Sequence, residues 1–377
     1  MAMRGKTVVS IITIGFCSAC VDRLFFDITL PATFPIVVNG FISSQPGPYR
    51  IDINKAFDVE SKDSIKQPVS VKSIEISDDQ GRKEILSEIR SGVYETSTNG
   101  IKGIVGRVYK IKIELPDGRV YESIPDTLPA PGRIDDLLLN FKAEQVDGTA
   151  KYGYDVVVNS SGSEDGNRRF LWKFKGTYKA LTHPEFNNLA CFYLNGKCNF
   201  APPCSGVINI APPGASPVFE RIKPCECCEC WYDLYNSTPV LSDIRFLEKG
   251  YFPNVKVRYL PIDQWILRDK IHIQVDQLSL THQSYTFWQA ILVQKTAANS
   301  LFQPVSGRIP SYFVQTSGSP SPINGIFYAT SVSSKSDYIK PIDVPNPNFI
   351  PEGLEVSDSC LKLFPYATTV KPDFWVD

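Results

Sequence analysis

Residues 107–124 read RVYKIKIELPDGRVYESI, and this stretch decides the fold class of the first part of the chain. Tyr109, Ile111 and Ile113 alternate with charged residues, which is the period-two pattern of a strand with one buried face. The residues Pro116–Gly118 follow, and the Asp-Gly pair among them tolerates the positive φ angles of a tight turn. The stretch therefore predicts a β-hairpin.

Similar short alternating runs occur earlier, between residues 35 and 97. These runs are PIVVNGFIS (35–43), PYRIDI (48–53), SVKSIEIS (70–77) and GVYETS (92–97). Strands of this length, separated by turn residues, are typical of a β-sandwich. We therefore expect an immunoglobulin-like sandwich over residues 34–128, followed by a stiff linker, PDTLPAPG (125–132).

The second part, residues 134–377, predicts a larger β-rich domain. Its clearest strands are YGYDVVVNSS (152–161), RRFLWKFKGTYKAL (168–181), KIHIQVDQLSLT (270–281) and GIFYATSV (325–332). In the second of these runs, Phe170, Trp172 and Phe174 share one face. The last run follows an Asn324-Gly325 pair, which predicts a turn.

One segment predicts a helix and another has no regular pattern. Residues 282–297 place Tyr285, Trp288, Ile291 and Leu292 on one face, which indicates a core-facing helix, and Thr281 or Ser284 is a suitable cap. Residues 182–240 lack periodicity, and irregular segments of such length are uncommon unless they carry function or are disordered. The predicted fold class is all-β, mainly β structure with one helix and an irregular insertion.

The N-terminus predicts an exported lipoprotein. Arg4 and Lys6 precede an apolar stretch that is too short to span a bilayer. It ends in Cys17-Ser18-Ala19-Cys20, which resembles a bacterial lipobox. We expect a signal peptide over residues 1–19, lipid attachment at Cys20, and a tether over 20–33. Two or three acyl chains would anchor the protein firmly to a membrane.

The overall charge excludes one class of partner. The formal net charge is −1, and no basic patch suited to a phosphate backbone stands out. We therefore expect no nucleic-acid partner.

Eight cysteines remain once Cys17 and Cys20 are set aside. They are Cys191, Cys198, Cys204, Cys225, Cys227, Cys228, Cys230 and Cys360. An exported chain passes through an oxidising compartment, so disulfides are the leading interpretation. Neighbouring cysteines, and those two apart, do not easily bond each other. We therefore expect the cluster at 225–230 to bond outward to the other four cysteines, which would hold the 182–240 insertion in one shape.

Two other interpretations of the cluster stay open. A metal site would need four converging thiolates, but the C-x-C-C-x-C spacing is tighter than usual for zinc. A redox role is the third interpretation. The aromatic residues that follow, Trp231, Tyr232 and Tyr235, either stack on a sugar or partner protein or pack against the disulfides.

No catalytic motif stands out. The metalloprotease, nucleophile-elbow, P-loop and dinucleotide fingerprints are absent from the sequence, and only three histidines occur. We expect no cofactor, no metal and no catalytic residue. A hydrolase that uses only carboxylates remains a lesser alternative.

The ordered combination of several segments resembles a known family. These segments are the N-terminal lipobox, FPIVVNGFISSQPGPYRIDI (34–53), CECCECW (225–231), SDIRF (242–246), QLSLTHQSYTFWQAILVQ (277–294), SLFQPVSGRIPS (300–311) and the C-terminal SCLKLFPYATTVKPDFWVD. Together they resemble the Bacteroidetes-type outer-membrane lipoproteins grouped as domain of unknown function forty-two forty-nine. Residues 319–332 depart from the family pattern.

The resemblance implies a location and a partner. Family members are commonly encoded beside TonB-dependent outer-membrane transporters, which implies a non-enzymatic accessory or ligand-presenting role in nutrient uptake. The protein would be lipid-anchored in the outer membrane, facing either the cell surface or the periplasm. Within it, the 182–240 insertion is the expected contact surface. A structural or assembly lipoprotein of an envelope complex is the alternative.

Overall fold

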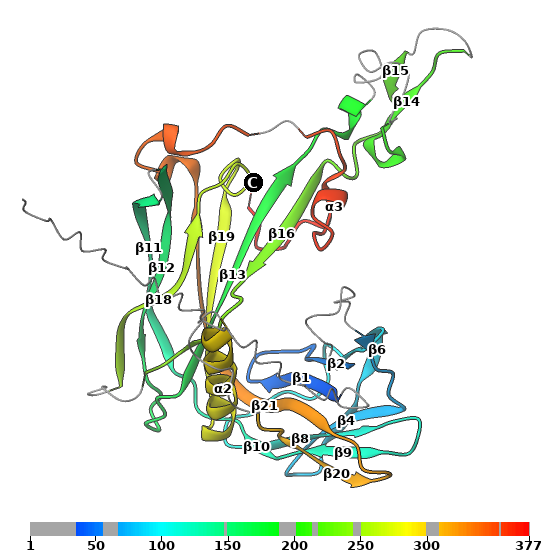
Figure 1. Ribbon diagram of the computed structural model, residues 1–377, viewed down its shortest axis with the longest axis vertical. Coiled ribbons are helices and arrows are strands. Elements are labelled where there is room, and N and C mark those ends of the chain that lie inside the picture. Colours follow the sequence, from blue (N-terminus) through cyan, green and yellow to red (C-terminus); the bar gives the residue numbers. More distant parts are fainter. Residues whose placement is uncertain are drawn as a thin grey trace, which may run out of the picture. The chain divides into compact units, whose positions relative to one another are not determined.

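The computed structural model describes residues 35–55, 67–146, 149–187, 201–212, 218–243, 250–298, 309–353 and 356–376 (Figure 1). Nearly half of these residues lie in strands and far fewer in helices, so the predicted all-β class is confirmed. Residues 35–377 form one compact unit. In the described part of this unit, no helix is both long and apolar enough to span a bilayer. The predicted leader, Cys20 and the tether lie outside the described residues.

A two-sheet sandwich is formed mainly by the described residues between 35 and 128. One sheet contains β1 (Ile36–Ser43), β2 (Arg50–Lys55), β7 (Val93–Glu95) and β6 (Ser87–Arg90), with the short β3 (Gln67–Pro68) on β2. The facing sheet has the order β20-β9-β8-β4-β5 and consists of β4 (Ser73–Asp78), β5 (Lys83–Ile85), β8 (Val108–Glu114), β9 (Val120–Ser123) and β20 (Phe313–Ser317), with β10 (Asp126–Thr127) on β8. Isoleucine and tyrosine side chains fill the core between them, including Ile51, Ile76 and Tyr109.

The hairpin predicted from residues 107–124 is confirmed as β8 and β9. Glu114 pairs with Val120, and Gly118 has a φ of 85°, the left-handed value that an Asp-Gly turn allows. Tyr109, Ile111 and Ile113 are buried, as their alternation predicts.

The sandwich differs from its prediction because it is completed by strands from far along the chain. The long strand β21 (Ile323–Ile339) pairs parallel with β1 from Ile36↔Ile323 to Ser43↔Thr330. β20 pairs with β9. Figure 1 shows β21, in orange, beside β1, in blue. The segment 34–128 therefore supplies most, but not all, of the first sandwich.

The predicted turn at Asn324-Gly325 is wrong, because both residues lie inside β21. Gly325 has a φ of 106°, and a Cβ atom there would lie 1.9 Å from the carbonyl oxygen of Val38. The glycine is therefore required for the close approach of β21 to β1, rather than for a reversal of the chain.

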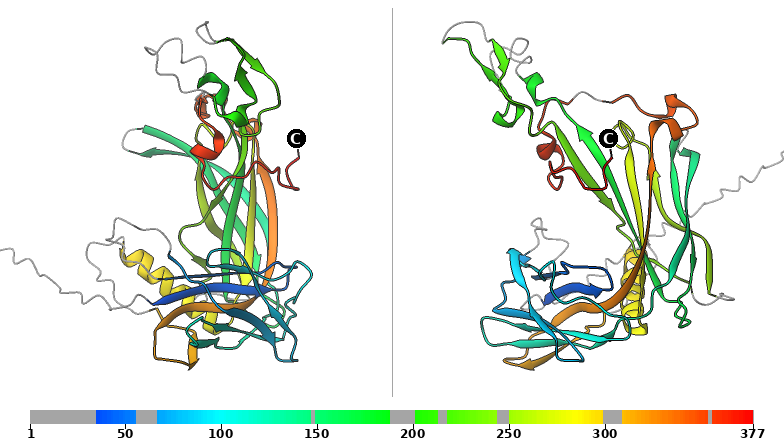
Figure 2. Two further views of the ribbon diagram at one scale, coloured as in Figure 1. Left: turned by 90° about the vertical axis from the view of Figure 1, so that its right-hand side faces the viewer. Right: turned by 180° about the vertical axis from the view of Figure 1, so that it is seen from behind.

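The second half of β21 belongs to a second pair of sheets. It pairs antiparallel with β19 (Ile271–Ser279), and the order continues through β13 (Phe170–Leu181) to β16 (Glu229–Tyr235), with β17 (Val240–Leu241) also on β13. Three strands form the facing sheet: β11 (Arg133–Val146), β12 (Thr149–Ser161) and β18 (Tyr251–Pro261). The right-hand view in Figure 2 shows β21 running from one pair of sheets to the other.

The two faces of β13, predicted from residues 168–181, pack in two different hydrophobic cores. Phe170, Trp172 and Phe174 are buried in the core between β13 and the three-stranded sheet. Leu171 points to the opposite face of β13, where it packs in the cluster that contains Tyr285 of α2 (His282–Ala298).

The predicted helix is confirmed as α2, and its N-terminus is capped as expected. Thr281 Oγ1 accepts a hydrogen bond from the main-chain nitrogen of Ser284, at 3.3 Å. Tyr285 and Phe287 are buried in the cluster, and Trp288 and Ile291 pack against it. The buried face is therefore wider than predicted, because it includes Phe287.

The remaining described elements are short. They are β14 (Val207–Asn209), β15 (Phe219–Arg221), the helix α3 (Cys360–Leu363) and four 3-10 turns at Pro184–Phe186 (η1), Pro203–Ser205 (η2), Pro341–Asp343 (η3) and Pro347–Phe349 (η4). The strands β14 and β15 pair only with each other.

Candidate functional site

Six cysteines in the described part of the chain form three disulfides. The pairs are Cys204–Cys227, Cys225–Cys228 and Cys230–Cys360. Two of these bonds reach from the 225–230 cluster to distant cysteines, as predicted. Cys191 and Cys198, like the lipidation candidate Cys20, lie outside the described residues.

The prediction that every cysteine of the cluster bonds outward is wrong for Cys225 and Cys228. These two residues are three apart, and the chain turns between them so that their Cα atoms are 5.7 Å apart. That distance lies inside the ordinary range for a disulfide. The restriction that applies to cysteines one or two apart therefore does not extend to three.

The Cys230–Cys360 bond attaches the C-terminal segment to the main sheet. Cys230 lies on β16, opposite Ala180 of β13. Both Cys230 and Cys360 are fully buried. The main chain of Trp231 also exchanges two hydrogen bonds with Thr368, at 2.8 and 3.0 Å. This disulfide closes a loop of more than one hundred residues, and its burial indicates a structural role.

The Cys204–Cys227 bond holds the base of the β14–β15 hairpin. Cys204 lies in η2, directly before β14, and Cys227 is buried next to the main sheet. Arg221 of β15 adds two contacts: it donates to the Ser205 carbonyl at 3.2 Å and pairs with Glu185 at 3.3 Å. An isolated two-stranded hairpin is marginal in water, so these ties account for its order.

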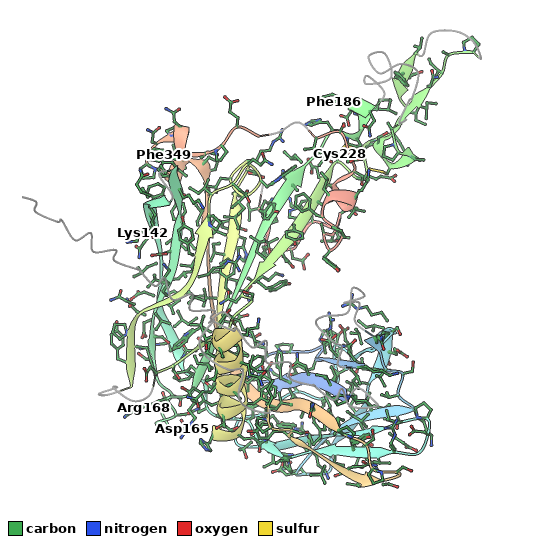
Figure 3. The ribbon with its side chains drawn as sticks, in the orientation of Figure 1. Lys142, Asp165, Arg168, Phe186, Cys228 and Phe349 are labelled. Atoms are coloured by element: carbon green, nitrogen blue, oxygen red, sulfur yellow. A yellow bond between two sulfur atoms is a disulfide. The ribbon has the colours of Figure 1, made fainter. Side chains whose placement is uncertain are left out.

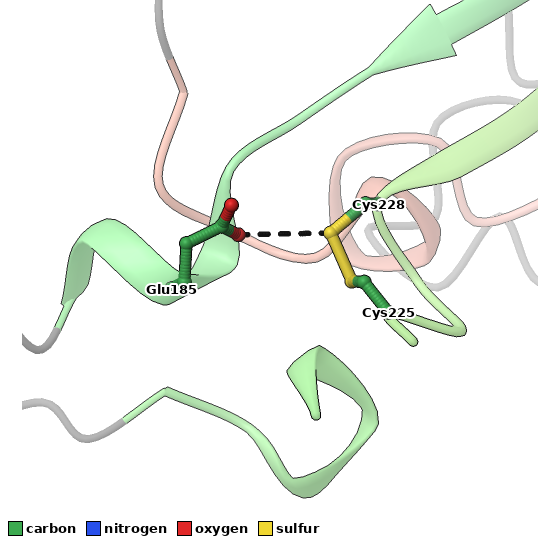
Figure 4. A group of neighbouring side chains, drawn as sticks. All are labelled: Glu185, Cys225 and Cys228. Atoms are coloured by element: carbon green, nitrogen blue, oxygen red, sulfur yellow. Dashed lines mark hydrogen bonds between the residues drawn. A yellow bond between two sulfur atoms is a disulfide. The ribbon is translucent and has the colours of Figure 1, made fainter. Parts of the chain in front are cut away.

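Glu185 lies beside the Cys225–Cys228 disulfide, as Figure 4 shows. Its Oε2 is 3.6 Å from the sulfur of Cys228, and its Oε1 is 3.5 Å from Nδ1 of His183. Glu185, Cys225 and Cys228 lie close enough to share a metal ion. Both sulfur atoms are, however, bonded to each other, so neither provides the thiolate that zinc requires. Figure 3 places Cys228 near Phe186 of η1, whose ring stacks on His183.

The three candidate contact aromatics separate into packed and exposed residues. Trp231 is buried and meets Trp375 edge to face. Tyr232 packs against Tyr178 and against Phe364, which follows α3. Only Tyr235 is largely exposed, at 60%. The packing interpretation therefore describes Trp231 and Tyr232, and leaves Tyr235 available for contact.

The hairpin presents one mainly aliphatic face to solvent. Ile208 pairs with Glu220, and the same register sets Ile210 opposite Val218 and Gly206 opposite Ile222. Because neighbouring pairs on a hairpin point to opposite sides, these alternate pairs share one face. Besides Glu220, this face carries four aliphatic side chains that are all exposed, by 42% to 58%: Ile208, Ile210, Val218 and Ile222. We call these four residues the hairpin face.

The hairpin face was not predictable from the sequence pattern. In VINIAPP (207–213) the alternation covers only the three residues from Ile208 to Ile210, and seven residues separate Ile210 from Val218. Only the pairing register of β14 with β15 puts the four aliphatic residues on one side. Exposed aliphatic residues that gather on one face are a common mark of an interaction surface.

A cavity with two carboxylates bears on the hydrolase alternative. It has a volume of about 460 Å³, and Asp337 and Asp343 are among its lining residues. Each carboxylate accepts a hydrogen bond from a nearby main-chain nitrogen, at 2.7 Å, from Tyr338 and Lys340 respectively. These bonds give both aspartates a role in shaping the local backbone.

Comparison with known proteins agrees with the resemblance noted in the sequence. No match was found among curated proteins. The family expected from the sequence is confirmed: the family model described as Domain of unknown function (DUF4249) matches residues 25–336, and the chain belongs to this family.

Proposed function

We propose that this protein is a non-enzymatic lipoprotein, anchored through Cys20 in the outer membrane, that acts by binding a TonB-dependent transporter through its hairpin face. The observation that carries the proposal is the exposure of four aliphatic side chains on one side of a disulfide-held hairpin. A mainly aliphatic surface on a disulfide-held hairpin suits protein contact, because little conformational entropy is lost when the partner binds.

The anchor and the partner rest on the N-terminal sequence and on family membership. The residues before Cys20 have the order of a lipoprotein signal, and a TonB-dependent transporter is the partner that the family resemblance implies. An accessory protein of this kind would hold or present a nutrient to the transporter. The disulfides support the exported location, since such bonds persist in oxidising compartments.

The test compares two double variants in native membranes. In I208T/I222T, threonine keeps the β-branched shape of two hairpin-face residues but adds a hydroxyl group. The matched control is I85T/I89T, which makes the same change at exposed isoleucines of the N-terminal sandwich, 67% and 55% exposed. Each protein, tagged at its C-terminus, is purified in mild detergent and the associated proteins are identified by mass spectrometry.

We expect the unchanged protein and I85T/I89T to recover a β-barrel transporter in stoichiometric amount. We expect I208T/I222T to lose about 90% or more of it, since two central aliphatic contacts are worth several kcal/mol at an interface. Recovery of the protein alone, or equal recovery of the transporter by both variants, contradicts the proposal. A different set of envelope proteins would instead favour the assembly role.

A further inference from the structure

A cavity of about 220 Å³ lies between helix α2, strand β13 and the turn 236–239 that joins β16 to β17. Its apolar wall includes Leu171, Trp288 and Ile291, and its polar wall includes Lys173 and Lys295. The lining residues, all within the described part of the chain, include two cations and no carboxylate. This cavity lies apart from the disulfides and from the hairpin face.

Lys173 differs from the other lysines on its face of β13. Lys175 and Lys179 each form an ion pair with an aspartate, at 3.1 and 3.2 Å. Lys173 forms no ion pair with any described residue. Its ammonium group instead lies 4.7 Å from the ring centre of Phe41 and 5.9 Å from that of Trp288. Aromatic faces attract a cation but leave it able to bind an anion.

The acidic residue opposite Lys173, Asp276, forms its hydrogen bonds with other side chains. Asp276 faces Lys173 in the antiparallel register of β13 and β19. Its Oδ1 accepts hydrogen bonds from Gln274, at 2.8 Å, and from Ser334, at 2.6 Å. Asp276 is also absent from the cavity lining, so the ammonium group of Lys173 keeps capacity for an anion within the cavity.

Lys295 supplies the second cation from the last turns of α2. Its ammonium group donates a hydrogen bond to the carbonyl oxygen of Ser237, and both residues line the cavity. An ammonium group has three donors, so this bond leaves two for another acceptor. No carboxylate in the described residues pairs with Lys295. The two lysines therefore place positive charge on the cavity wall from two separate elements.

Two further lining residues have polar atoms without partners. Nε1 of Trp288 and Oδ1 of Asn236 are buried, and neither bonds to a described residue. The amide nitrogen of Asn236 is used, because it donates to the Val257 carbonyl at 3.1 Å. Since buried polar groups are nearly always hydrogen bonded, one donor and one acceptor remain to be satisfied beside the cavity.

We propose that this cavity binds a small organic carboxylate with an apolar or aromatic body. The carboxylate would bind the ammonium groups of Lys173 and Lys295, and the body would pack against Trp288 and Ile291. A hydroxyl or amine on the ligand would donate to Oδ1 of Asn236. The charge, the apolar wall and the free hydrogen-bonding groups all match this chemistry. The proposal goes beyond the transporter contact and does not depend on it.

The test measures binding of a charged probe and its neutral counterpart by titration calorimetry on the purified full-length protein in detergent. The probes are 2-naphthoate and 2-naphthamide, which share the aromatic body but differ in charge. We expect 2-naphthoate to bind one site per chain, about tenfold more tightly than 2-naphthamide, at low salt. Because charges cause the preference, it should shrink as ionic strength rises.

The variants Lys173→Gln and Lys295→Gln locate the site. Each should weaken 2-naphthoate binding by about fivefold or more and leave 2-naphthamide binding unchanged. The control Lys112→Gln removes an exposed lysine from β8 and should change neither. Lys295 is exposed, so its variant carries the test even if Lys173→Gln fails to fold. The proposal is overturned if 2-naphthoate shows no saturable binding below about 1 mM, if both probes bind equally, or if both lysine variants bind as the unchanged protein does.

Discussion

Asp126 is a buried carboxylate at the junction of three elements. It belongs to β10, it is only 3% exposed, and it bonds to two other parts of the chain. The Thr281 hydroxyl, at the cap of α2, donates to its Oδ1 at 2.7 Å, and the main-chain nitrogen of Ala329 in β21 donates to its Oδ2 at 3.1 Å. Burial raises the pKa of Asp126 from 3.8 to about 6, because two neutral donors only partly replace the lost water.

The raised pKa of Asp126 predicts a particular pH dependence of stability. Between pH 4 and 6 the folded chain binds a proton at this site that the unfolded chain has lost, so the free energy of unfolding falls as pH rises through this window. By pH 7 the ionisation of Asp126 has lowered the free energy of unfolding by roughly 3 kcal/mol. In Asp126→Asn the side chain cannot ionise, and the Thr281 hydroxyl can reverse to accept from the new amide. We therefore expect Asp126→Asn to gain stability relative to the unchanged protein by about 2–3 kcal/mol between pH 4 and pH 7.

Urea unfolding of both proteins at several pH values measures this difference. Other carboxylates follow the opposite trend. Hydrogen bonds hold the pKa of Glu84, for example, below its usual value, so the stability that Glu84 contributes to the folded state rises with pH. Subtracting the two curves removes those common contributions. A difference that stays flat from pH 4 to 7 would show that Asp126 does not titrate in this range.

At the scale of elements, β21 is the strand on which both pairs of sheets depend. Its first half pairs with β1 and its second half with β19. Gly325 lies in the first half, where the carbonyl oxygen of Val38 would be 1.9 Å from an added Cβ atom. Any side chain at this position must push β21 away from β1.

We predict that Gly325→Ala lowers the free energy of unfolding by at least about 3 kcal/mol, because it combines a strained positive φ with a backbone overlap. The matched control is Gly118→Ala in the β8–β9 turn. Gly118 also has a positive φ, but nothing lies within 4 Å of its added Cβ atom. Gly118→Ala should therefore lower the free energy of unfolding by only about 1 kcal/mol. Thermal or chemical unfolding of the two variants compares them, and equal losses would contradict the role given to Gly325.

The elements that sequence analysis predicted each contain a stretch with a recognisable period. The strand β8 alternates throughout, β13 alternates from Trp172 to Lys175, and α2 places Tyr285, Trp288 and Ile291 at helical spacing. By contrast, β11 contains the run Leu137–Leu139 and a register shift between Ile134 and Asp136, so alternation is lost. β18 contains Pro253 and a positive φ at Asn254, features more typical of a loop. In these strands, pairing with distant partners overrides local preference.

The candidate site was predictable in kind but not in detail. The expected export through an oxidising compartment indicated disulfides, but not that Cys225 would bond Cys228, since that depends on a local turn. The anion cavity left no sign in the sequence. Its two lysines are more than one hundred residues apart, and they meet only because α2 packs on the face of β13 that carries Leu171.

For the whole molecule, the sharing of β21 means that the first sandwich cannot be a self-contained domain. Its core includes four residues from beyond residue 300: Phe313, Ile323, Phe327 and Ala329. Without β20 and β21, the segment 35–128 would expose its side of that core and leave β1 and β9 without their outer neighbours. Exposed apolar core and unpaired strand edges both disfavour folding.

We therefore predict that a fragment of residues 35–128 is largely unfolded, whereas the same fragment joined by a flexible linker to residues 309–332 folds cooperatively. The joined segment supplies β20 and the half of β21 that pairs with β1, together with all four distant core residues. Circular dichroism and the dispersion of amide signals in NMR spectra distinguish the two fragments. The replacement Phe327→Asp in the joined fragment is the control, because a charge at this fully buried position should abolish folding again. If residues 35–128 fold alone with the stability of the joined fragment, the sandwich is independent and β21 is an addition to it. If only the joined fragment folds, the chain must be nearly complete before its first sandwich can form, because β20 and β21 lie more than 180 residues after the segment that they complete.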